Sequence, residues 1–320
     1  MRALTGEHPM NEDLRRILEK QKYRVVGDHS GVKVCHWLGQ RLIHNRSCYK
    51  ERFYGINSHR CLQMTPAVND CTQMCLFCWR FQGFGSTLPD VHDDPEEVLE
   101  GCLEAHRKLI QGFKGDPRCK PEDFAEAMEP NQVACSLSGE PTLYSHLGEL
   151  FQACHDRGMT TFLVTNGTRP DVLAELDPLP TQLYVSVVAP DVETHRKLCA
   201  PFEVSAWDDL MRTLDLLPSL DTRKVIRHTL VSGYNMGNEE GYSRLIERAD
   251  PDFVEAKGYV FVGDSRRRMT LENMPSHDAV RAFSKRLAEG SGYEIRNEQH
   301  SSRVVLLARP GMGSTRIDGK

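Results

Sequence analysis

Cys71-Thr-Gln-Met-Cys75-Leu-Phe-Cys78-Trp-Arg is the stretch that decides how this chain is interpreted, because it spaces three cysteines as C-x3-C-x2-C. Three thiolates on one tight loop can bind three irons of a 4Fe–4S cube and leave the fourth iron open. In ferredoxins, four cysteines ligate all four irons of the cluster, which then serves electron transfer. The alternatives are chance spacing and a zinc knuckle, but zinc sites usually come as two paired halves, and no second pair follows. The triplet favours an open cluster that can chelate and reduce a small molecule.

Composition places the chain among ordinary globular proteins. Hydrophobic residues make up 39% of its 320 residues, and its mean hydropathy is −0.48. No apolar run approaches the length that spans a bilayer, and the N-terminus lacks the apolar core of a signal peptide. We therefore expect a cytoplasmic protein without a membrane partner, in which eleven cysteines suit metal ligation better than disulfides. The net charge of −5 means that any contact with nucleic acid must come from local basic patches.

Strand and helix alternate about six times along the chain, after an amphipathic helix at 11–22. Strands are expected at 62–65, 133–137, 161–164, 183–188, 224–231 and 253–261. Helices are expected at 96–111, 147–157, within 192–217, at 241–249 and at 276–289, the last with Ser276 as its N-cap. Residues 32–60 are interpreted as irregular, 112–130 as a surface insertion, and 293–296 and 304–307 as short terminal strands. The alternation predicts parallel β/α units with right-handed crossovers in one decorated domain.

The cysteine triplet resembles the signature of the radical S-adenosylmethionine (SAM) enzymes, in which SAM binds the open iron. Loops after the next strands fit this resemblance, because β/α barrels collect their chemistry at the carboxyl ends of strands. Ser138-Gly139-Glu140-Pro141 resembles the motif that accepts the SAM amine, since glycine permits close backbone approach and a carboxylate pairs with an ammonium. Thr165-Asn166-Gly167 matches the family's polar residues near SAM, and Ser186 could bind a ribose hydroxyl. Taken alone, these segments are also common turns and an ordinary strand serine.

A second cysteine pattern lies upstream of the triplet. Cys35, Cys48 and Cys61 are spaced as C-x12-C-x12-C, which is not a zinc pattern and does not pair evenly. They could hold a second 4Fe–4S cluster through three ligands, again with one iron open. The alternative is that they are buried structural cysteines, which would not need such regular spacing. The remaining cysteines are expected mostly to be small buried apolar residues: Cys102, Cys119, Cys135, Cys154 and Cys199.

The two triplets together resemble one family, the wyosine-base synthases that make 4-demethylwyosine in tRNA. Nine residues separate Cys61 from Cys71, and Lys50 stands two residues after Cys48, as in that family. Two further segments, 257–263 and 273–275, resemble its last barrel strand and the following loop. The resemblance covers roughly residues 30–290. It implies the short form without the flavodoxin-like domain of eukaryotic relatives, and hence an external electron donor of the flavodoxin or ferredoxin type.

The resemblance implies a radical condensation that uses two 4Fe–4S clusters and SAM. N1-methylguanosine at position 37 of tRNA(Phe) would receive two carbons from pyruvate, which gives a lyase of carbon–carbon bonds in wybutosine biosynthesis. A 5′-deoxyadenosyl radical would take hydrogen from the N1-methyl group, and the resulting radical would attack pyruvate held near the second cluster. A carboxyl fragment would leave, and a carbonyl would condense with the guanine amine. Lys50 would form a Schiff base with the pyruvate carbonyl, although on sequence alone a solvated surface lysine fits as well.

The resemblance also implies the fold, a partial (β/α)6 TIM-like barrel of the radical SAM type with N- and C-terminal extensions. The expected division is 1–60 for the extension with the upstream cysteines, 61–275 for the radical SAM core, and 276–320 for a helix and short strands. We expect a monomer. Two other functions stay open at this point: a different two-cluster radical SAM enzyme, or a zinc-binding RNA-associated protein.

Contacts with the anticodon loop of tRNA rest on weaker signals. A basic stretch with interleaved aromatic residues surrounds Cys48 and contains Arg46 and Arg52. Arg266, Arg267 and Arg268 form a compact basic run on the last expected barrel loop. Arginine–phosphate contacts and base stacking on aromatic rings would suit a loop whose target base is splayed out. Solvated charge runs are the alternative for both segments.

Overall fold

A computed structural model of the chain describes residues 10–83 and 91–317. The first nine residues, on which the expected lack of a signal peptide rests, lie outside this part. The chain divides into two compact units, and each is described by itself. The first contains Met1–Arg46, His59–Cys71 and Gly83–Thr161, and the second contains Ser47–Ser58, Thr72–Gln82 and Phe162–Lys320. The boundaries expected at residues 60 and 275 stay a prediction.

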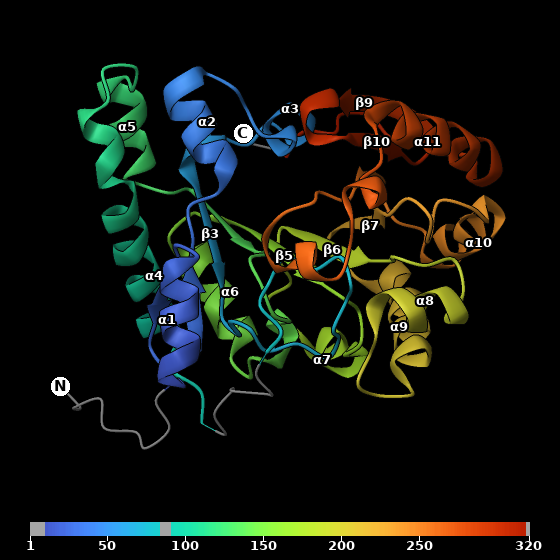
Figure 1. Ribbon diagram of the computed structural model, residues 1–320, viewed down its shortest axis with the longest axis horizontal. Helices are drawn as coiled ribbons and strands as arrows, with labels where there is room; N and C mark the ends of the chain where they lie inside the picture. The colour runs from blue at the N-terminus through green and yellow to red at the C-terminus, as the bar shows by residue number, and fades with distance from the viewer. Residues whose placement is uncertain (1–9, 84–90, 318–320) are drawn as a thin grey trace. The chain divides into compact units, whose positions relative to one another are not determined.

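The first unit begins with helix α1 (Glu12–Lys20), which confirms the amphipathic helix expected there (Figure 1). The Asn11 side chain caps it by accepting hydrogen bonds from the N–H groups of Asp13 at 2.9 Å and Leu14 at 3.3 Å. Leu14 and Leu18 lie one turn apart and are both buried, whereas Arg16 between them is exposed.

The sheet of the first unit has the strand order β1-β2-β3-β4. Its strands are β1 (Arg24–Val26), β2 (Ser30–Val32), β3 (Cys61–Thr65) and β4 (Gln132–Cys135). The β1–β2 and β2–β3 pairs are antiparallel, and β3 and β4 are parallel. The parallel pair confirms the first expected crossover, and its carboxyl ends lead into the loops that carry Cys71 and Ser138.

Helices cover this sheet and its connections. They are α2 (His36–His44), α4 (Pro95–Ile110), α5 (Pro121–Ala127) and α6 (Leu147–Asp156). Helix α4 packs against α6 and against β1 and β2. Asp94 caps α4 and Pro95 is its first residue, which is the usual chemistry of a helix start.

The second unit contains a mixed sheet with the order β5-β6-β7-β8-β10-β9. Its strands are β5 (Thr160–Thr165), β6 (Gln182–Ser186), β7 (Arg223–Leu230), β8 (Phe253–Gly258), β9 (Glu294–Gln299) and β10 (Val304–Ala308). Strands β5 to β8 are parallel, as the alternation predicts. Strand β10 pairs antiparallel with β8, and β9 with β10, so the sheet continues past β8 instead of closing a barrel.

Most helices of the second unit lie between these strands in the chain, and α3 precedes them. They are α3 (Tyr49–Tyr54), α7 (Pro170–Glu175), α8 (Val192–Cys199), α9 (Ala206–Leu216), α10 (Glu239–Ala249) and α11 (His277–Ser291). Helices α10 and α11 lie side by side (Figure 1), and α11 packs against β8 and β10. Tyr242, Ile246, Phe283 and Leu287 form a core there with apolar strand residues. None of the described helices is both long enough and apolar enough to cross a membrane.

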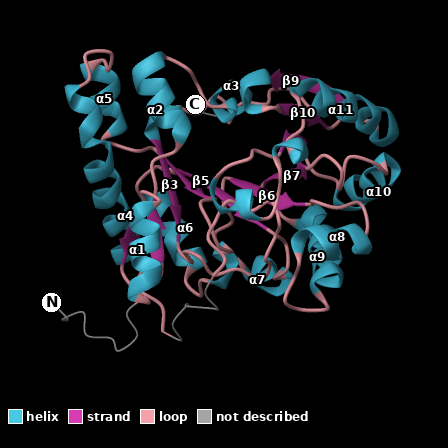
Figure 2. Ribbon diagram, viewed as in Figure 1, coloured by secondary structure: helices cyan, strands magenta, loops and turns pink. Residues whose placement is uncertain are grey.

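The interpretation of residues 32–60 as irregular is wrong, because α2 and α3 both form there; Figure 2 shows them as short helices flanked by loops. Neither has the long apolar repeat that marks a helix in sequence. Each ends on a left-handed residue, Asn45 for α2 and Gly55 for α3, and this is the signal that sequence reasoning could have used. The expected insertion at 112–130 also contains a helix, α5.

The predicted N-cap of the last helix offers a test of the fold. The Ser276 side chain accepts a hydrogen bond from the Ala279 N–H at 3.1 Å, at the start of α11. Ser276→Ala should lower the free energy of unfolding by about 1 kcal/mol, read from the midpoint of urea unfolding. Ser276→Asp should keep the cap and stay close to the parent protein. Equal losses in both variants would show that the side-chain oxygen does not carry the effect.

Candidate functional site

The second and third cysteines of the triplet lie on a loop, Thr72–Gln82, that belongs to the second unit and is called the cysteine loop below. Backbone hydrogen bonds hold it to the end of α8: Met74 N donates to Ala200 O at 3.1 Å, and Leu76 N donates to Leu198 O at 2.9 Å. A turn then follows, in which Cys78 N donates to Cys75 O at 3.1 Å. The loop is therefore ordered by a neighbouring segment and not by a helix or strand of its own.

Two guanidinium groups hold the carbonyl groups of the cysteine loop. Arg80 donates from Nη2 to Gln73 O at 2.6 Å and is buried. Arg268 donates from Nε to Leu76 O at 3.2 Å and from Nη2 to Cys78 O. Arg268 was expected to contact RNA, yet its guanidinium contacts this loop. Sequence reasoning missed Arg80 altogether, although it stands two residues after Cys78.

The thiols of this loop are poor anions when they have no metal. A hydrogen bond with Cys199 and burial raise the pKa of Cys75 well above its ordinary value, and the Cys75 thiol donates to Gln73 Oε1 at 3.3 Å. Burial raises the pKa of Cys78, against the opposing charge of Arg80. Any metal that binds these two thiols would have to displace their protons, so its binding would depend on pH.

The serine–glycine–glutamate loop of the first unit packs against the chain just before Cys71. Glu140 N donates to Asp70 O at 2.6 Å. Gly139 has a φ of +77°, and a Cβ built on it would lie 1.8 Å from Ala67 O and 2.5 Å from Asp70 O. Only glycine fits there, for reasons of both conformation and space.

Two polar groups of this loop suit a ligand that carries an amine. The Glu140 carboxylate is only 2% exposed and accepts hydrogen bonds from Thr142 Oγ1 at 2.8 Å and Thr142 N at 3.2 Å. The Ser138 hydroxyl is buried and has no hydrogen-bond partner among the residues at 10–83 and 91–317. A buried hydroxyl without a partner is costly, and a bound polar ligand would satisfy it.

The polar residues after β5 face the cysteine loop within the second unit. Asn166 donates from Nδ2 to Thr72 Oγ1 at 2.8 Å and accepts at Oδ1 from Thr168 Oγ1 at 2.7 Å. Thr72 and Thr168 are themselves 2.7 Å apart at their hydroxyl groups, and sequence reasoning singled out neither. The Thr165 hydroxyl accepts from Gly167 N at 3.1 Å and is buried, whereas Ser186 is half-buried at the end of β6.

The upstream cysteines each sit at the start of an element. Cys35 precedes α2, Cys48 precedes α3, and Cys61 is the first residue of β3. A pocket of about 400 Å³ in the first unit opens beside Cys35 and is lined by basic residues that include His36, His44 and Arg118. In the described part of the chain, no three His, Cys, Asp or Glu side chains converge as ligands of a single ion.

Exposure separates the eleven cysteines into the two groups expected from spacing. The six cysteines of the two triplets are all half-buried. The other five are all buried, which confirms the expectation for them. A ligand to a cluster must face the space that the cluster fills, so partial exposure of the first six residues suits this role.

Lys50 is buried, being 8% exposed, and its amine lies between two aromatic rings of the second unit. Nζ is 4.5 Å from the ring centroid of Phe162 and 4.5 Å from that of Tyr184. A solvated surface lysine, the alternative raised by the sequence, does not describe this position. Both rings come from strands of the parallel sheet, β5 and β6.

A buried polar network fixes the helix that carries Lys50. Arg227 pairs with Glu255 at 3.0 Å and donates from Nη2 to the Tyr49 hydroxyl at 2.8 Å. Tyr54 donates to Glu255 at 2.7 Å, and Arg227 also lies 4.4 Å from the Tyr184 ring centroid. Glu255 is fully buried, and these hydrogen bonds and the ion pair replace the water contacts that its side chain loses on burial.

The other arginines expected to contact RNA are exposed. Arg46 and Arg266 lie on the surface, and Arg267 forms an ion pair with Asp264 at 3.2 Å. Arg52 is also exposed and donates from Nε to Asn297 Oδ1 at 2.9 Å. Their charges are thus available to a large partner, in contrast to Arg268.

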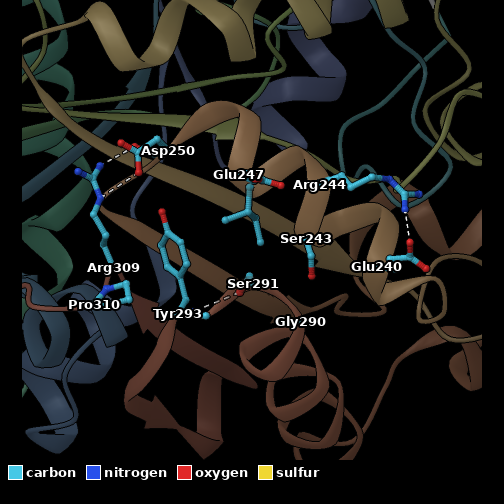
Figure 3. Close-up of a pocket in the computed structure, with 12 residues that line it drawn as sticks. Glu240, Ser243, Arg244, Glu247, Asp250, Gly290, Ser291, Tyr293, Arg309 and Pro310 are labelled. Carbon is cyan, nitrogen blue, oxygen red and sulfur yellow. Dashed lines mark hydrogen bonds and ion pairs between the residues drawn. The ribbon is translucent and has the colours of Figure 1, made fainter.

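Another pocket, of about 570 Å³, opens between α10 and α11 and contains none of the predicted site residues. Figure 3 shows its charged rim, where Arg309 pairs with Asp250 at 3.2 Å and Arg244 with Glu240 at 2.6 Å. Both arginines of this pocket are thus paired with carboxylates of its own lining.

Two known families match successive parts of the chain. Residues 65–245 match the radical SAM superfamily, and residues 248–309 match the family described as wyosine base formation. The tRNA 4-demethylwyosine synthase of Pyrococcus abyssi is 51% identical over 306 residues, which are 94% of this chain and 90% of that protein.

Solved structures agree with these matches. The structure of TYW1 with a lysine–pyruvate adduct bound is 39% identical, with a TM-score of 0.88 over 98% of this chain and 100% of that one. The crystal structure of archaeal TYW1 is 36% identical, with a TM-score of 0.81 over 96% of this chain and 99% of that one. At these values the likeness covers the whole architecture described above.

Gly139 gives the sharpest test of the first-unit loop. Gly139→Ala should weaken SAM binding at least tenfold, because the new methyl group must push the loop away from Ala67 and Asp70. Gly158→Ala is the matched control, since Gly158 has a similar φ of +67° but nothing within 4 Å of its added Cβ. Calorimetric titration with SAM should show normal affinity in this control. Equal weakening in both variants would trace the effect to backbone strain and not to the contact.

Proposed function

The chain belongs to the tRNA 4-demethylwyosine synthase family of radical SAM enzymes, and we propose that it joins pyruvate to N1-methylguanosine-37 of tRNA(Phe). The product is 4-demethylwyosine, and the reaction class is that of a carbon–carbon lyase. Use of SAM and an iron–sulfur cluster follows from the family. A zinc-binding protein without enzymatic activity is therefore set aside.

We assign the cofactors to the two cysteine triplets. Cys71, Cys75 and Cys78 hold the SAM-cleaving cluster, and Cys35, Cys48 and Cys61 hold a second 4Fe–4S cluster. When bound, these groups and SAM supply a 5′-deoxyadenosyl radical that takes a hydrogen atom from the N1-methyl group. Gly139 and five polar residues bind SAM: Ser138, Glu140, Thr165, Asn166 and Ser186. The Ser138 hydroxyl, which has no hydrogen-bond partner among the described residues, and the buried Glu140 carboxylate support this assignment.

Lys50 is the residue that binds pyruvate, and its burial between two aromatic rings is the observation that carries the proposal. Its amine adds to the ketone carbon, and water leaves as the Schiff base forms. The rings of Phe162 and Tyr184 restrict the directions from which a ketone can approach. A lysine–pyruvate adduct in a relative that is 39% identical supports the same chemistry here.

The partners follow from this reaction. The anticodon loop of tRNA presents the methylated base, and the exposed arginines Arg46, Arg52, Arg266 and Arg267 are the candidates for phosphate contact. An external protein of the flavodoxin or ferredoxin type delivers the electron. The enzyme acts as a monomer in the cytoplasm.

Replacement of Lys50 tests the proposal directly. Lys50→Ala should abolish the adduct that borohydride traps with pyruvate, detected as a mass increase of the intact protein. It should also abolish 4-demethylwyosine while SAM cleavage to 5′-deoxyadenosine stays measurable, because the cluster ligands are untouched. The amount of 4-demethylwyosine is measured by nucleoside analysis of the methylated tRNA after the reaction.

Lys257→Ala is the control for that experiment. Its Nζ lies 5.3 Å from the ring centroid of Tyr49, next to Lys50 in the chain, so it is a nearby lysine on an aromatic ring. The trapped adduct should persist in this variant. Full product yield from Lys50→Ala, or loss of the adduct only in Lys257→Ala, would remove Lys50 from this role.

The three consecutive arginines after β8 should differ in function, with Arg266 and Arg267 contacting tRNA and Arg268 supporting the cysteine loop. Arg266→Ala with Arg267→Ala should weaken tRNA binding and reduce the slope of log affinity against log salt by about 1 for each arginine that pairs with a phosphate. Arg268→Ala should instead lower the iron content, because it frees the carbonyl groups of the cysteine loop. Arg244→Ala, an exposed arginine on α10, is the control. Unchanged tRNA affinity in the double variant would exclude this run from the RNA interface.

A further inference from the structure

Within the second unit, the Cys75 thiol belongs to a line of three buried polar side chains. Cys75 Sγ donates to Gln73 Oε1 at 3.3 Å, and Gln73 Nε2 lies 3.3 Å from His195 Nε2. Gln73 is 3% exposed and His195 is 2% exposed, so water reaches neither contact freely. Gln73 stands between the first two cysteines of the triplet, and His195 lies on α8.

The chemistry of the groups fixes the direction of these hydrogen bonds. An amide nitrogen only donates, so His195 Nε2 must accept from Gln73. Burial and the charge of Arg196 lower the pKa of His195 to about 4, so its ring is neutral and carries one proton, on Nδ1. Nδ1 is buried and has no hydrogen-bond partner in the described part of the chain. The bond with Gln73 alone therefore sets which ring nitrogen carries the proton.

This arrangement suits a free thiol and not a sulfur that ligates iron. A ligated sulfur has no proton, so it can accept a hydrogen bond but cannot donate one. The Gln73 carbonyl would then face an electron-rich sulfur with no hydrogen between them. A half-turn of the amide exchanges its two ends, which have nearly the same shape. Nε2 then donates to the Cys75 sulfur, and Oε1 accepts from His195 Nε2. The ring keeps its single proton, which moves from Nδ1 to Nε2.

We propose that Gln73 is a positioning residue that donates its amide N–H to the Cys75 sulfur in the loaded enzyme, and that His195 holds the amide in this direction. The proposal rests on the function above, in which Cys71, Cys75 and Cys78 hold the SAM-cleaving cluster. Hydrogen bonds to the sulfurs of a cluster help to set its reduction potential. A donor stabilises the more negative, reduced state, so Gln73 makes one-electron reduction of this cluster easier.

The fold holds both ends of this contact while the side chains rearrange. Arg80 donates from Nη2 to Gln73 O at 2.6 Å, and Gln73 forms an isolated antiparallel bridge with Pro201. The His195 ring packs against Trp207 of α9, with 5.4 Å between the ring centroids. The half-turn of the amide and the change of tautomer therefore need no movement of the backbone.

The other two side chains that bond to Cys75 need no such reversal. Cys199 bonds to the same sulfur, and its thiol can still donate when Cys75 is a ligand. Gln82 donates from Nε2 to the Cys75 carbonyl at 3.1 Å and not to its sulfur. Gln82 is therefore a matched control for Gln73, because it has the same side chain, lies on the same loop and bonds to the same residue.

The proposal is tested by a redox titration of the reconstituted holoenzyme, followed by electron paramagnetic resonance. The SAM-binding cluster is identified by the change in its signal when SAM is added. Gln73→Leu should lower the equilibrium constant for its one-electron reduction about threefold. The midpoint potential then becomes about 28 mV more negative, because a tenfold change corresponds to 59 mV for one electron. Gln82→Leu should keep the parent potential, and the iron content of each variant shows that its clusters are complete.

Two further variants keep the test decisive if Gln73→Leu fails to bind iron. Gln73→Glu keeps the shape of the side chain, but its ionised carboxylate can only accept hydrogen bonds. Its potential should become at least as negative as that of Gln73→Leu. His195→Phe keeps a ring against Trp207 but no longer holds the amide, so it should shift the potential in the same direction by a smaller amount.

Parent potentials in both Gln73 variants would overturn the proposal, and so would an equal shift in Gln82→Leu, which would trace the effect to the loop as a whole. A parent potential in His195→Phe would remove His195 from this role. Failure of the proposed function has a separate signature. Cys75→Ala would then retain the full signal that responds to SAM, whatever the potentials of the other variants.

Discussion

The backbone hydrogen bonds between the cysteine loop and the end of α8 are the constraint on which the proposed chemistry depends. Three thiolates must keep a fixed spacing, yet residues 72–82 form no helix or strand that would impose it. Ordering a loop residue costs about 1–2 kcal/mol, which roughly equals the net contribution of one hydrogen bond. The loop therefore needs several partners. Residues 198–202 and Arg268 contact it from outside, and Arg80 bonds to it from within the loop. The arginines bond to carbonyl groups of the loop and not to its thiols.

The position of Lys50 in the second unit is also fixed by contacts with other segments, but here side chains make the contacts. A six-residue helix is too short to be stable alone, so α3 must be held by its side chains. Tyr49 and Tyr54 reach the buried Arg227–Glu255 pair from the two ends of the helix. Burial is the main reason that the pKa values of both tyrosines are raised, so they stay neutral hydrogen-bonding partners. The position of Lys50 thus follows from a charge pair that lies on two neighbouring strands.

The parts of the fold that could be predicted from the sequence are the strands and helices with a periodic pattern of apolar residues. The parallel strands and long helices carry apolar residues with a regular period, and they lie where they were expected. Strands β1 and β2 have three residues each and are set by their pairing partners, so their own sequence has no period to show. Arg268 illustrates a second limit. A run of three arginines suggests one surface, but the fold turns the last of them to the carbonyl groups of Leu76 and Cys78. Thr72 and Thr168 have no motif at all and became visible only through their contact with Asn166.

Cysteine spacing and cysteine exposure are independent observations, and their agreement strengthens the assignment of two clusters. A raised thiol pKa does not separate the groups, because burial raises it to about 12 in Cys154 and also raises it in Cys78. Exposure of the residue does separate them, since a cluster ligand must border open space and a core cysteine must not. If spacing had arisen by chance, the fold would have no reason to keep these six cysteines half-buried and the other five buried. The half-buried cysteines therefore form two regular sets of three, and two three-ligand clusters account for both regularities at once.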